Sequence, residues 1–137
     1  MKIQITNDLK HIRSVYDRIS EYCQQNNIDD TTKFNLNLIV EEYITNIINH
    51  GSIEPNVHDI QIEVEQKGDK IYTKITDDAT EFNPLEAELP DIDKKIKEKQ
   101  PGGLGVFLIL QKAENIKYYR KNNRNNFEFL LTTNVEK

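Results

Sequence analysis

The sequence has little of several residue types and patterns: it contains one cysteine, five glycines and no tryptophan. A single cysteine forms no disulfide within the chain, so we interpret Cys23 as a core residue, with a reactive thiol as the alternative. No hydrophobic run approaches the roughly 20 residues that a membrane-spanning helix needs. The first ten residues, MKIQITNDLK, alternate instead of forming the apolar block of a secretory signal. We therefore predict a cytoplasmic protein that does not associate with a membrane.

Basic charge is scarce as well. The formal net charge is -5 at pH 7, whereas a nucleic-acid-binding domain usually shows a basic patch. The densest basic stretches are KKIKEK, residues 94–99, and YYRKNNR, residues 118–124. Acidic residues precede and interrupt the first, and the second has the pattern of a strand that leads into a turn. We interpret both as solvated surface and predict no direct contact with nucleic acid.

The remaining composition is typical of a soluble globular protein, since 36% of the residues are hydrophobic and 30% are charged. The length suits one domain over residues 1–137. Residues 2–6 alternate like a short strand. Apolar residues then recur at steps of three and four and predict one helix face, which consists of Leu9, Ile12, Tyr16, Ile19 and Cys23. Asn7 or Asp8 is the expected cap of this helix.

A second helix is predicted over residues 31–50, with Asp29 or Asp30 as its cap and Gly51 just past its end. Its apolar side chains form one broad arc, which consists of Leu36, Ile39, Val40, Tyr43, Ile44, Ile47 and Ile48. A polar stripe borders this arc and consists of Asn35, Glu42, Asn46 and Asn49. Side chains at such a border between core and solvent are placed to point into a cleft.

Two β-hairpins are predicted after the second helix. HDIQIEVEQ and KIYTKITD alternate on either side of the turn KGD, and IKYYRK and NFEFLLTT do so on either side of KNNRNN. Between the hairpins, residues 79–101 hold three prolines and many charges, which predicts a long loop, and loops of that length are usually functional or mobile. A third helix is expected to begin within GLGVFLILQKA. This order of elements predicts an α+β fold, a two-layer α/β sandwich whose mostly antiparallel sheet is covered on one face by helices.

The polar stripe of the second helix suits a metal–phosphate site. Glu42, Asn46 and His50 are spaced four apart, so they stack on one side of the helix. Mg²⁺ prefers oxygen ligands and keeps several waters, so the carbonyl oxygen of Asn46 together with phosphate oxygens is a suitable ligand set. Glu42, one turn away, is placed to accept a proton from an attacking hydroxyl. The alternative is a solvated helix face with His50 as a cap.

Two further stretches suit a nucleotide. In ITDDATEFNPLE, Asp77 and Asp78 are expected to leave the sheet and enter the loop, where a carboxylate suits an exocyclic amine such as that of adenine. The alternative is a turn-forming pair of aspartates. In PGGLGVFLI, glycines before a helix let backbone N–H groups approach a phosphate, and the alternative is a glycine-rich turn without a ligand. The sequence contains no GxxxxGK[ST] motif, so any phosphate is not held by a P-loop.

Taken in order, these three stretches resemble a known set of motifs. E-x-x-x-N near a helix end, D-x-x-x-x-F-N-P after a strand and G-G-L-G-V-F-L-I before a helix are similar to the N, G1 and G2 boxes of the GHKL, or histidine kinase-like, ATPases. Within that superfamily the chain resembles the small RsbW-type anti-sigma factors, which are serine/threonine kinases. VEEYITNIINHG, DDATEFNPLEAELPD, QPGGLGVFLI and the final hairpin fall in family order, so the resemblance covers nearly the whole chain.

The resemblance implies an ATP site between the helices and the long loop. It implies that Glu42 is the catalytic base, that Asn46 binds Mg²⁺ and that Asp77 binds the adenine amino group. It also implies further contacts with the nucleotide, from Asn49, His50, Ala79, Phe82, Gly102, Gly103, Leu104, Gly105, Val106 and, on the last hairpin, Asn126. The glycines would form the hinge of an ATP lid over about residues 85–103.

The resemblance implies partners too: a STAS-type anti-anti-sigma protein as the substrate, a sigma factor as a binding partner, and a homodimer. The chain departs from the common D-x-G-x-G form of the G1 box, because Ala79 and Glu81 stand at the glycine positions. Glu81 would add bulk and negative charge near the nucleotide. The alternatives are therefore a nucleotide-gated binding switch with little or no phosphotransfer, or a scaffold that retains only the fold. A sensor histidine kinase carries its phosphoacceptor histidine on a helical dimerisation domain that precedes the ATPase domain. His11 lies on a predicted helix but within the first dozen residues, which leaves no room for such a domain, so we do not expect a complete sensor histidine kinase.

Overall fold

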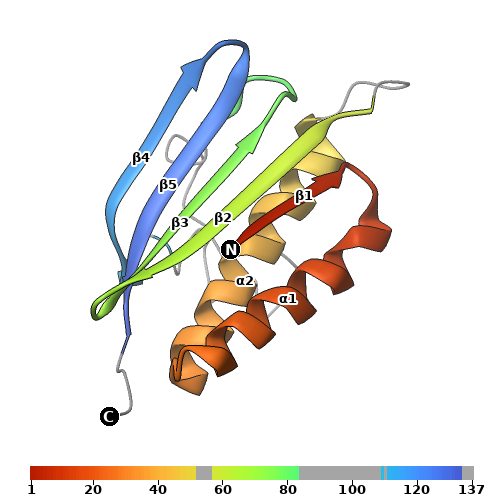
Figure 1. Ribbon diagram of the computed structural model, residues 1–137. Helices are drawn as coiled ribbons and strands as arrows, with labels where there is room; N and C mark the ends of the chain where they lie inside the picture. Colours follow the sequence, from red (N-terminus) through yellow and green to blue (C-terminus); the bar gives the residue numbers. More distant parts are fainter. Residues whose placement is uncertain (52–56, 84–108, 110, 134–137) are drawn as a thin grey trace, which may run out of the picture.

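The computed structural model describes residues 1–51, 57–83, 109 and 111–133. Five strands form one sheet in the order β1-β2-β3-β5-β4, and every neighbouring pair is antiparallel. The strands are β1 Lys2–Thr6, β2 Asp59–Lys67, β3 Lys70–Asp77, β4 Ala113–Lys121 and β5 Arg124–Thr132. Two helices, α1 Ile12–Gln25 and α2 Asp30–Asn46, cover one face of this sheet (Figure 1). The predicted two-layer α+β architecture is confirmed.

The two faces of the sheet differ because the side chains of each strand alternate. Apolar residues of β2, β3 and β5 point toward the helices and are buried, among them Ile62, Ile75 and Phe127. The opposite face is polar. One row of side chains crosses all five strands with alternating charge and consists of Lys2, Glu63, Lys74, Glu128 and Lys117. Opposite charges on neighbouring strands stabilise such a row by a few tenths of a kcal/mol per pair and suit a solvated face.

The first helix starts later than its sequence pattern predicts, and its buried face differs. Leu9 belongs to a 3₁₀ turn, η1 Leu9–His11, that Asp8 caps by accepting a hydrogen bond from the backbone nitrogen of Lys10 at 3.0 Å. A 3₁₀ turn has three residues per turn, so it shifts Leu9 out of register with the helix that follows. The buried stripe of α1 is Val15, Ile19 and Cys23. The prediction that Leu9 and Tyr16 face the core is wrong, since they are 54% and 46% exposed.

The second helix follows its prediction closely at its start. Asp29 is the cap, because its Oδ2 accepts a hydrogen bond from the backbone nitrogen of Thr32 at 3.0 Å. The predicted apolar arc is buried except for Ile48, which is partly buried against the core. The end differs from the prediction: α2 stops at Asn46, and residues Ile47–Gly51 form a π-helical turn, η2. Such turns occur often at functional sites.

Both hairpins are confirmed, with tight turns. Gly68 in the first turn has a φ of 64°, a value that glycine adopts without strain. In the second turn, Asn122 and Asn123 have φ values of 54° and 60°, which suits a two-residue turn. This turn is shorter than the predicted KNNRNN, because Arg124 and the residues after it already pair in β5. Of the third predicted helix, the described residues 109, 111 and 112 are helical.

Candidate nucleotide-binding site

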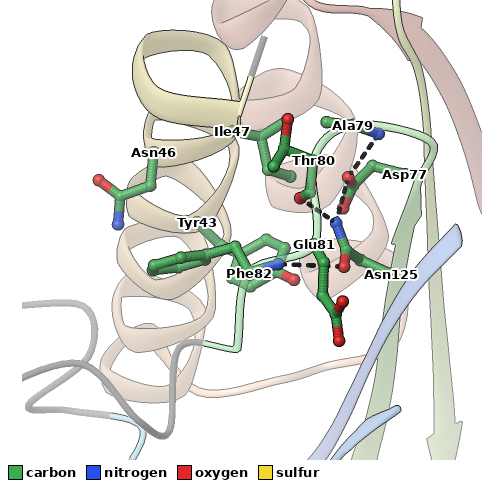
Figure 2. Close-up of a pocket in the computed structure, with 9 residues that line it drawn as sticks. All are labelled: Tyr43, Asn46, Ile47, Asp77, Ala79, Thr80, Glu81, Phe82 and Asn125. Atoms are coloured by element: carbon green, nitrogen blue, oxygen red, sulfur yellow. Dashed lines mark hydrogen bonds between the residues drawn. The ribbon is translucent and has the colours of Figure 1, made fainter. Parts of the chain in front are cut away.

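A cavity of about 140 Å³ lies between the C-terminal part of α2, the last residue of β3 and the beginning of β5 (Figure 2). Its lining residues are Tyr43, Asn46, Ile47, Asp77, Ala79, Thr80, Glu81, Phe82 and Asn125. Sites for whole drug-sized ligands usually measure about 300–1,000 Å³. The described part of this cavity therefore has room for one ring system and not for a whole nucleotide.

Asp77 is the buried acidic group of the cavity. It is the last residue of β3 and pairs with Asn125 of β5, so it stays within the sheet instead of leaving it as the sequence pattern predicted. Its side chain is fully buried. The Oδ1 atom accepts hydrogen bonds from the backbone nitrogen of Ala79 at 3.0 Å and from Nδ2 of Asn125 at 2.9 Å. The Oδ2 atom is buried and has no hydrogen-bond partner among the described residues.

The ionisation of Asp77 reflects this environment. Burial raises the pKa of its carboxyl group above the usual range, because a charged group loses its hydration there. The hydrogen bonds from Asn125 and Ala79 act against this rise, as do the positive charges of Arg124 and Arg120. A buried carboxylate oxygen without a partner is costly unless a ligand donates a hydrogen bond to it. An exocyclic amine is such a donor.

Asn125 is the site residue that the sequence analysis missed. The structure places Asn125, not the predicted Asn126, at the cavity. Asn126 lies opposite Thr76 on the polar face of the sheet, where its Nδ2 donates to the carbonyl oxygen of Arg124 at 3.1 Å. The alternation of side chains along β5 would have identified Asn125 from the sequence. Phe127 faces the helices, so Asn125, two residues away, must face them as well.

Tyr43 forms the helical wall of the cavity. Its ring is buried and stacks on Phe127, and burial raises the pKa of its hydroxyl group, with the nearby Asp77 and Tyr118 adding to this. Tyr43 is therefore neutral at physiological pH and offers an aromatic surface to a ligand. Ala79, predicted beside the nucleotide, lines the cavity and is buried. Phe82, also predicted, lines it and is 43% exposed.

The departures in the G1 box have different consequences. Ala79 replaces a glycine by one methyl group, which is buried within the cavity wall. Glu81 is exposed but lines the cavity, so its carboxylate stands where a ligand would enter. Its negative charge also contributes to a raised pKa of the Tyr118 hydroxyl, for which burial is the main cause. The charge expected near the nucleotide is therefore present at the rim.

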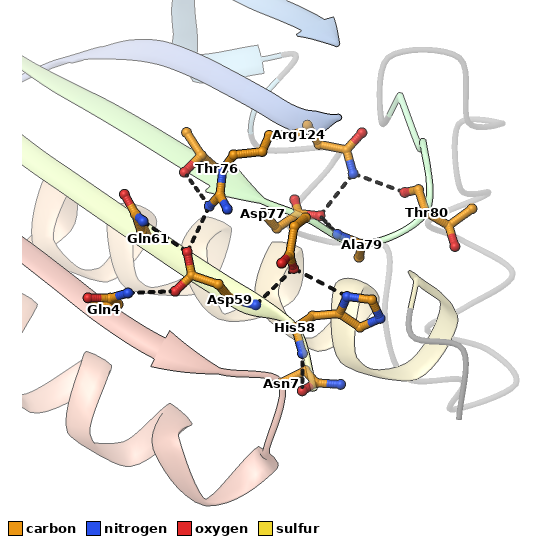
Figure 3. Close-up of polar contacts among 12 residues, drawn as sticks. Gln4, Asn7, His58, Asp59, Gln61, Thr76, Asp77, Ala79, Thr80 and Arg124 are labelled. Carbon is orange, nitrogen blue, oxygen red and sulfur yellow. Dashed lines mark hydrogen bonds and ion pairs between the residues drawn. The ribbon is translucent and has the colours of Figure 1, made fainter. Parts of the chain in front are cut away.

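Asp78 ties the segment after β3 to the start of β2. Figure 3 shows the polar contacts in this region, around Asp59 and Asp77. Oδ1 of Asp78 accepts a hydrogen bond from the backbone nitrogen of Asp59 at 2.8 Å and lies 3.2 Å from Nδ1 of His58. Asp59 forms an ion pair with Arg124 at 3.0 Å. These contacts fix Asp78 between two strands, so the backbone on either side of it, at Asp77 and Ala79, has a defined place.

The polar stripe of α2 meets the cavity at one residue. Asn46 lines the cavity and is partly exposed, whereas Glu42, one turn earlier and also partly exposed, is not among the lining residues. Asn49 is exposed. Among the described residues no three acidic, histidine or cysteine side chains gather into a metal cluster. An amide oxygen at a cavity rim fits a Mg²⁺ ion that takes its other ligands from phosphate and water.

Several predicted site residues lie outside the part of the chain that the structure describes. These are Gly102, Gly103, Leu104, Gly105 and Val106, together with the predicted lid at about residues 85–103 and the side chain of His50. The structure thus brings together Asn46, Asp77, Ala79 and Phe82 from the predicted set and adds Tyr43, Thr80 and Asn125, which line the same cavity. In the described residues no helix is long and apolar enough to cross a membrane.

A helical layer on an antiparallel sheet, with a base-sized cavity around a buried aspartate, defines a nucleotide-binding domain of the histidine kinase-like class. The family described as histidine kinase-like ATPase domain matches residues 5–129. The chain belongs to this family, and membership implies that it binds ATP.

Similar proteins include the serine/threonine-protein kinase BtrW of Bordetella bronchiseptica, which is 25% identical over 93 residues. That match covers 68% of this chain and 66% of BtrW, slightly less than two thirds of its length. The structure of the RsbU and RsbW domains of a Mycobacterium tuberculosis protein matches 97% of this chain with a TM-score of 0.62 and 9% identity, and 32% of that solved chain is covered. A histidine kinase domain from an Erythrobacter litoralis blue-light activated histidine kinase matches 90% of this chain and 59% of that chain, with a TM-score of 0.53 and 16% identity. These structures share the fold.

Proposed function

We propose that this protein is an ATP-dependent serine/threonine kinase of the anti-sigma factor type, formed by a single ATPase domain over residues 1–137 with a lid at about residues 85–103. Its substrate would be a STAS-type anti-anti-sigma protein, and it would also bind a sigma factor and thereby regulate transcription in the cytoplasm as a homodimer. The observation that carries the proposal is the buried, unpaired Oδ2 of Asp77 in a cavity the size of a base. The name of BtrW supports the kinase activity.

The residues divide the chemistry between them. Asp77 would accept a hydrogen bond from the adenine amine, and the ring of Tyr43 would pack beside the base. Asn46 would hold Mg²⁺ through its amide oxygen, and the ion supplies charge neutralisation for the phosphates when it is bound. Asn49, His50 and the glycines of residues 102–105 would lie along the ribose and phosphates.

Glu42 would act as the general base of the transfer. The substrate serine Oγ attacks the γ-phosphorus of ATP, the bond from that phosphorus to the β–γ bridging oxygen breaks, and ADP leaves. The serine proton passes to the Glu42 carboxylate. Glu42 and Asn46 are one helical turn apart on α2, so a base and a metal ligand share one rigid element.

A nucleotide-gated binding switch is the second candidate, and Glu81 favours it. Its carboxylate at the cavity rim would repel the polyphosphate of ATP if the two lie close together. Such a protein would bind nucleotide and clamp a partner, yet transfer little or no phosphate.

Incubation with γ-³²P-labelled ATP, Mg²⁺ and candidate STAS proteins from the same organism separates the two functions. A kinase places label on a serine or threonine of the STAS protein, and a variant of that protein with alanine at the labelled position stays unlabelled. Binding of ATP to the chain without transfer to any such partner supports the switch. Absence of nucleotide binding rejects both.

A further inference from the structure

The side-chain oxygen of Asn125 faces three hydrogen-bond donors. It lies 2.5 Å from the hydroxyl of Tyr118, 3.1 Å from Nη1 of Arg120 and 3.3 Å from the backbone nitrogen of Phe82. A guanidinium group and a backbone N–H donate hydrogen bonds and never accept them. The atom of the Asn125 amide on this side must therefore be its oxygen.

The amide nitrogen of Asn125 faces two acceptors. Nδ2 lies 2.9 Å from Oδ1 of Asp77 and 2.9 Å from the carbonyl oxygen of Thr80. A carboxylate and a carbonyl accept hydrogen bonds, so the group between them must be the NH₂ (Figure 2). The orientation of the Asn125 amide is thus fixed from both sides, which is a stronger constraint than either side alone would provide.

The orientation of the Asn125 amide decides which oxygen of Asp77 is hydrogen-bonded. Its Oδ1 receives two donors from the chain, Asn125 Nδ2 and the backbone nitrogen of Ala79, and both arrive at the same oxygen. Its Oδ2 is left buried and unpaired within the described part of the chain, in a residue that lines the cavity. The group that Asp77 presents to a ligand is therefore an acceptor with no donor of its own.

Arg120 extends the arrangement to the backbone. Its Nη1 also donates to the carbonyl oxygen of Ala79 at 2.8 Å, so β4 is tied to the segment that follows β3. The same residue, Ala79, donates its N–H to Asp77. Tyr118 and Arg120 are two residues apart on β4 and both reach the Asn125 oxygen, so we refer to this pair as the β4 clamp.

We propose that Asn125, held by the β4 clamp, is a positioning residue that turns one oxygen of Asp77 toward the cavity and so makes the site select a 6-amino purine over a 6-oxo purine. The inference rests on the proposed nucleotide site. A 6-amino group donates to Oδ2, whereas a 6-oxo group places a second acceptor against it. Two buried acceptors without a donor between them cost about 1–3 kcal/mol, which corresponds to roughly 5- to 150-fold in affinity.

Calorimetric titration with ADP and with inosine diphosphate, its 6-oxo counterpart, tests the selectivity directly. The titrations are made at about pH 8, because a more alkaline solution favours the carboxylate form, which is the form that accepts a hydrogen bond at Oδ2. We expect wild-type protein to bind ADP at least about tenfold more tightly than inosine diphosphate. In Asp77→Asn the two donors at the Oδ1 position require an oxygen there, so the new NH₂ must occupy the Oδ2 position. The preference should then invert toward inosine diphosphate.

A second variant tests the β4 clamp without touching Asp77. Tyr118→Phe/Arg120→Met removes two of the three donors to the Asn125 oxygen. The donor that stays is the backbone N–H of Phe82, at 3.3 Å. The ratio of the two affinities should fall at least about fivefold. The matched control is Tyr119→Phe/Lys121→Met, which removes one phenol hydroxyl and one positive charge from the opposite face of β4 and should keep the wild-type ratio. If the clamp variant does not fold in a thermal melt, Tyr118→Phe alone should lower the ratio about twofold or more.

Three outcomes would reject the proposed role of Asn125. A wild-type ratio near one, an unchanged ratio in the clamp variant, or Asp77→Asn that still prefers ADP or binds neither nucleotide would overturn it. Failure of the nucleotide site itself looks different, because wild-type protein would then bind neither ADP nor inosine diphosphate. Selective ADP binding without phosphotransfer would reject the kinase and leave the role of Asn125 standing.

Discussion

The ring of Tyr43 on α2 lies parallel to the ring of Phe127 on β5, with centroids 4.8 Å apart and an interplanar angle of 10°. This stack joins the helix that carries Glu42 and Asn46 to the strand that carries Asn125. Tyr43 also lines the cavity, so the contact that closes the core at this point forms one wall of the candidate site.

A double-mutant cycle should show that the Tyr43–Phe127 stack is a specific interaction. Aromatic pairs contribute about 0.5–1.5 kcal/mol beyond their buried area. Tyr43→Leu and Phe127→Leu should each lower the free energy of unfolding by about 1–3 kcal/mol, and the double variant should lose about 1 kcal/mol less than the sum. Urea unfolding measures all four proteins. Effects that add to within about 0.3 kcal/mol would show that the rings contribute by their volume alone.

The parts of the fold that the sequence predicts well are those in which local pattern and burial agree. Alternation predicts both hairpins, because one face of each strand packs under the helices. The cap at Asp29 is predicted for a similarly local reason, since a carboxylate there reaches a free N–H of the first helical turn. The fold class follows from the order of these elements.

The errors arise where a local irregularity changes the register of a regular pattern. The 3₁₀ turn at residues 9–11 places Leu9 in solvent although its spacing is helical, whereas Tyr16 lies beside the buried stripe of α1 and not within it. The π-helical turn at residues 47–51 ends α2 one turn before the pattern predicts. A single-residue offset on β5 likewise separates Asn125 from Asn126, and these two side chains lie on opposite faces of the sheet.

The network around Asn125 could not be predicted from spacing. Its partners come from β3, β4 and the segment after β3, and the residue farthest from it in sequence is Asp77, 48 positions away. The motifs did predict that Asn46, Asp77, Ala79 and Phe82 lie together, because each is placed by a regular element or directly follows one. What the motifs cannot give is the direction in which an amide points.

Asp77→Asn should stabilise the ligand-free protein at neutral pH. The folded-state pKa of Asp77 is raised above the unfolded value of about 3.9, so the folded state disfavours the charged form. The contribution of this group to stability is fully present below the unfolded pKa and is lost as pH rises through the folded pKa. The substitution should add about 0.5–2 kcal/mol at pH 7, a range common for single stabilising substitutions.

Thermal unfolding of wild-type and Asp77→Asn protein between about pH 3 and 8 checks this linkage. The difference between the two proteins should be small in acid and should grow toward neutral pH. Asp78→Asn is a suitable control, because Asp78 is the neighbouring aspartate but is exposed, and its Oδ1 accepts a hydrogen bond from the backbone nitrogen of Asp59. A wild-type protein that is more stable than Asp77→Asn at pH 7 would show that the hydrogen bonds to Oδ1 outweigh the cost of burial.

Glu42→Gln should slow phosphotransfer and leave nucleotide binding intact. The substitution keeps the shape of the side chain but removes its basicity, and loss of a general base typically costs about 10²-fold or more in rate. The dissociation constant for ADP should change less than about twofold, because the base acts on the substrate hydroxyl and not on the nucleotide. Single-turnover transfer from labelled ATP to the STAS partner gives the rate.

Glu41→Gln is the matched control for this experiment. Glu41 precedes Glu42 on α2 but is exposed on the groove between α1 and α2, away from the cavity. It should transfer phosphate at the wild-type rate. Full activity of Glu42→Gln would reject Glu42 as the base, whereas loss of activity in both variants would point to an effect of charge on the whole helix.

Asp29→Ala should destabilise the protein more than a helix cap alone explains, because Asp29 also holds the end of the sheet. Its Oδ1 accepts hydrogen bonds from the hydroxyls of Thr32 at 2.7 Å and Thr133 at 2.9 Å. Loss of a cap costs about 0.5–2 kcal/mol, and the buried hydroxyl of Thr133 would lose a partner as well, so we expect about 2–3 kcal/mol in urea unfolding. Asp30→Ala, which removes an exposed ion pair with Lys33, should cost less than about 1 kcal/mol. Equal losses in the two variants would mean that the link from Asp29 to Thr133 contributes nothing to stability.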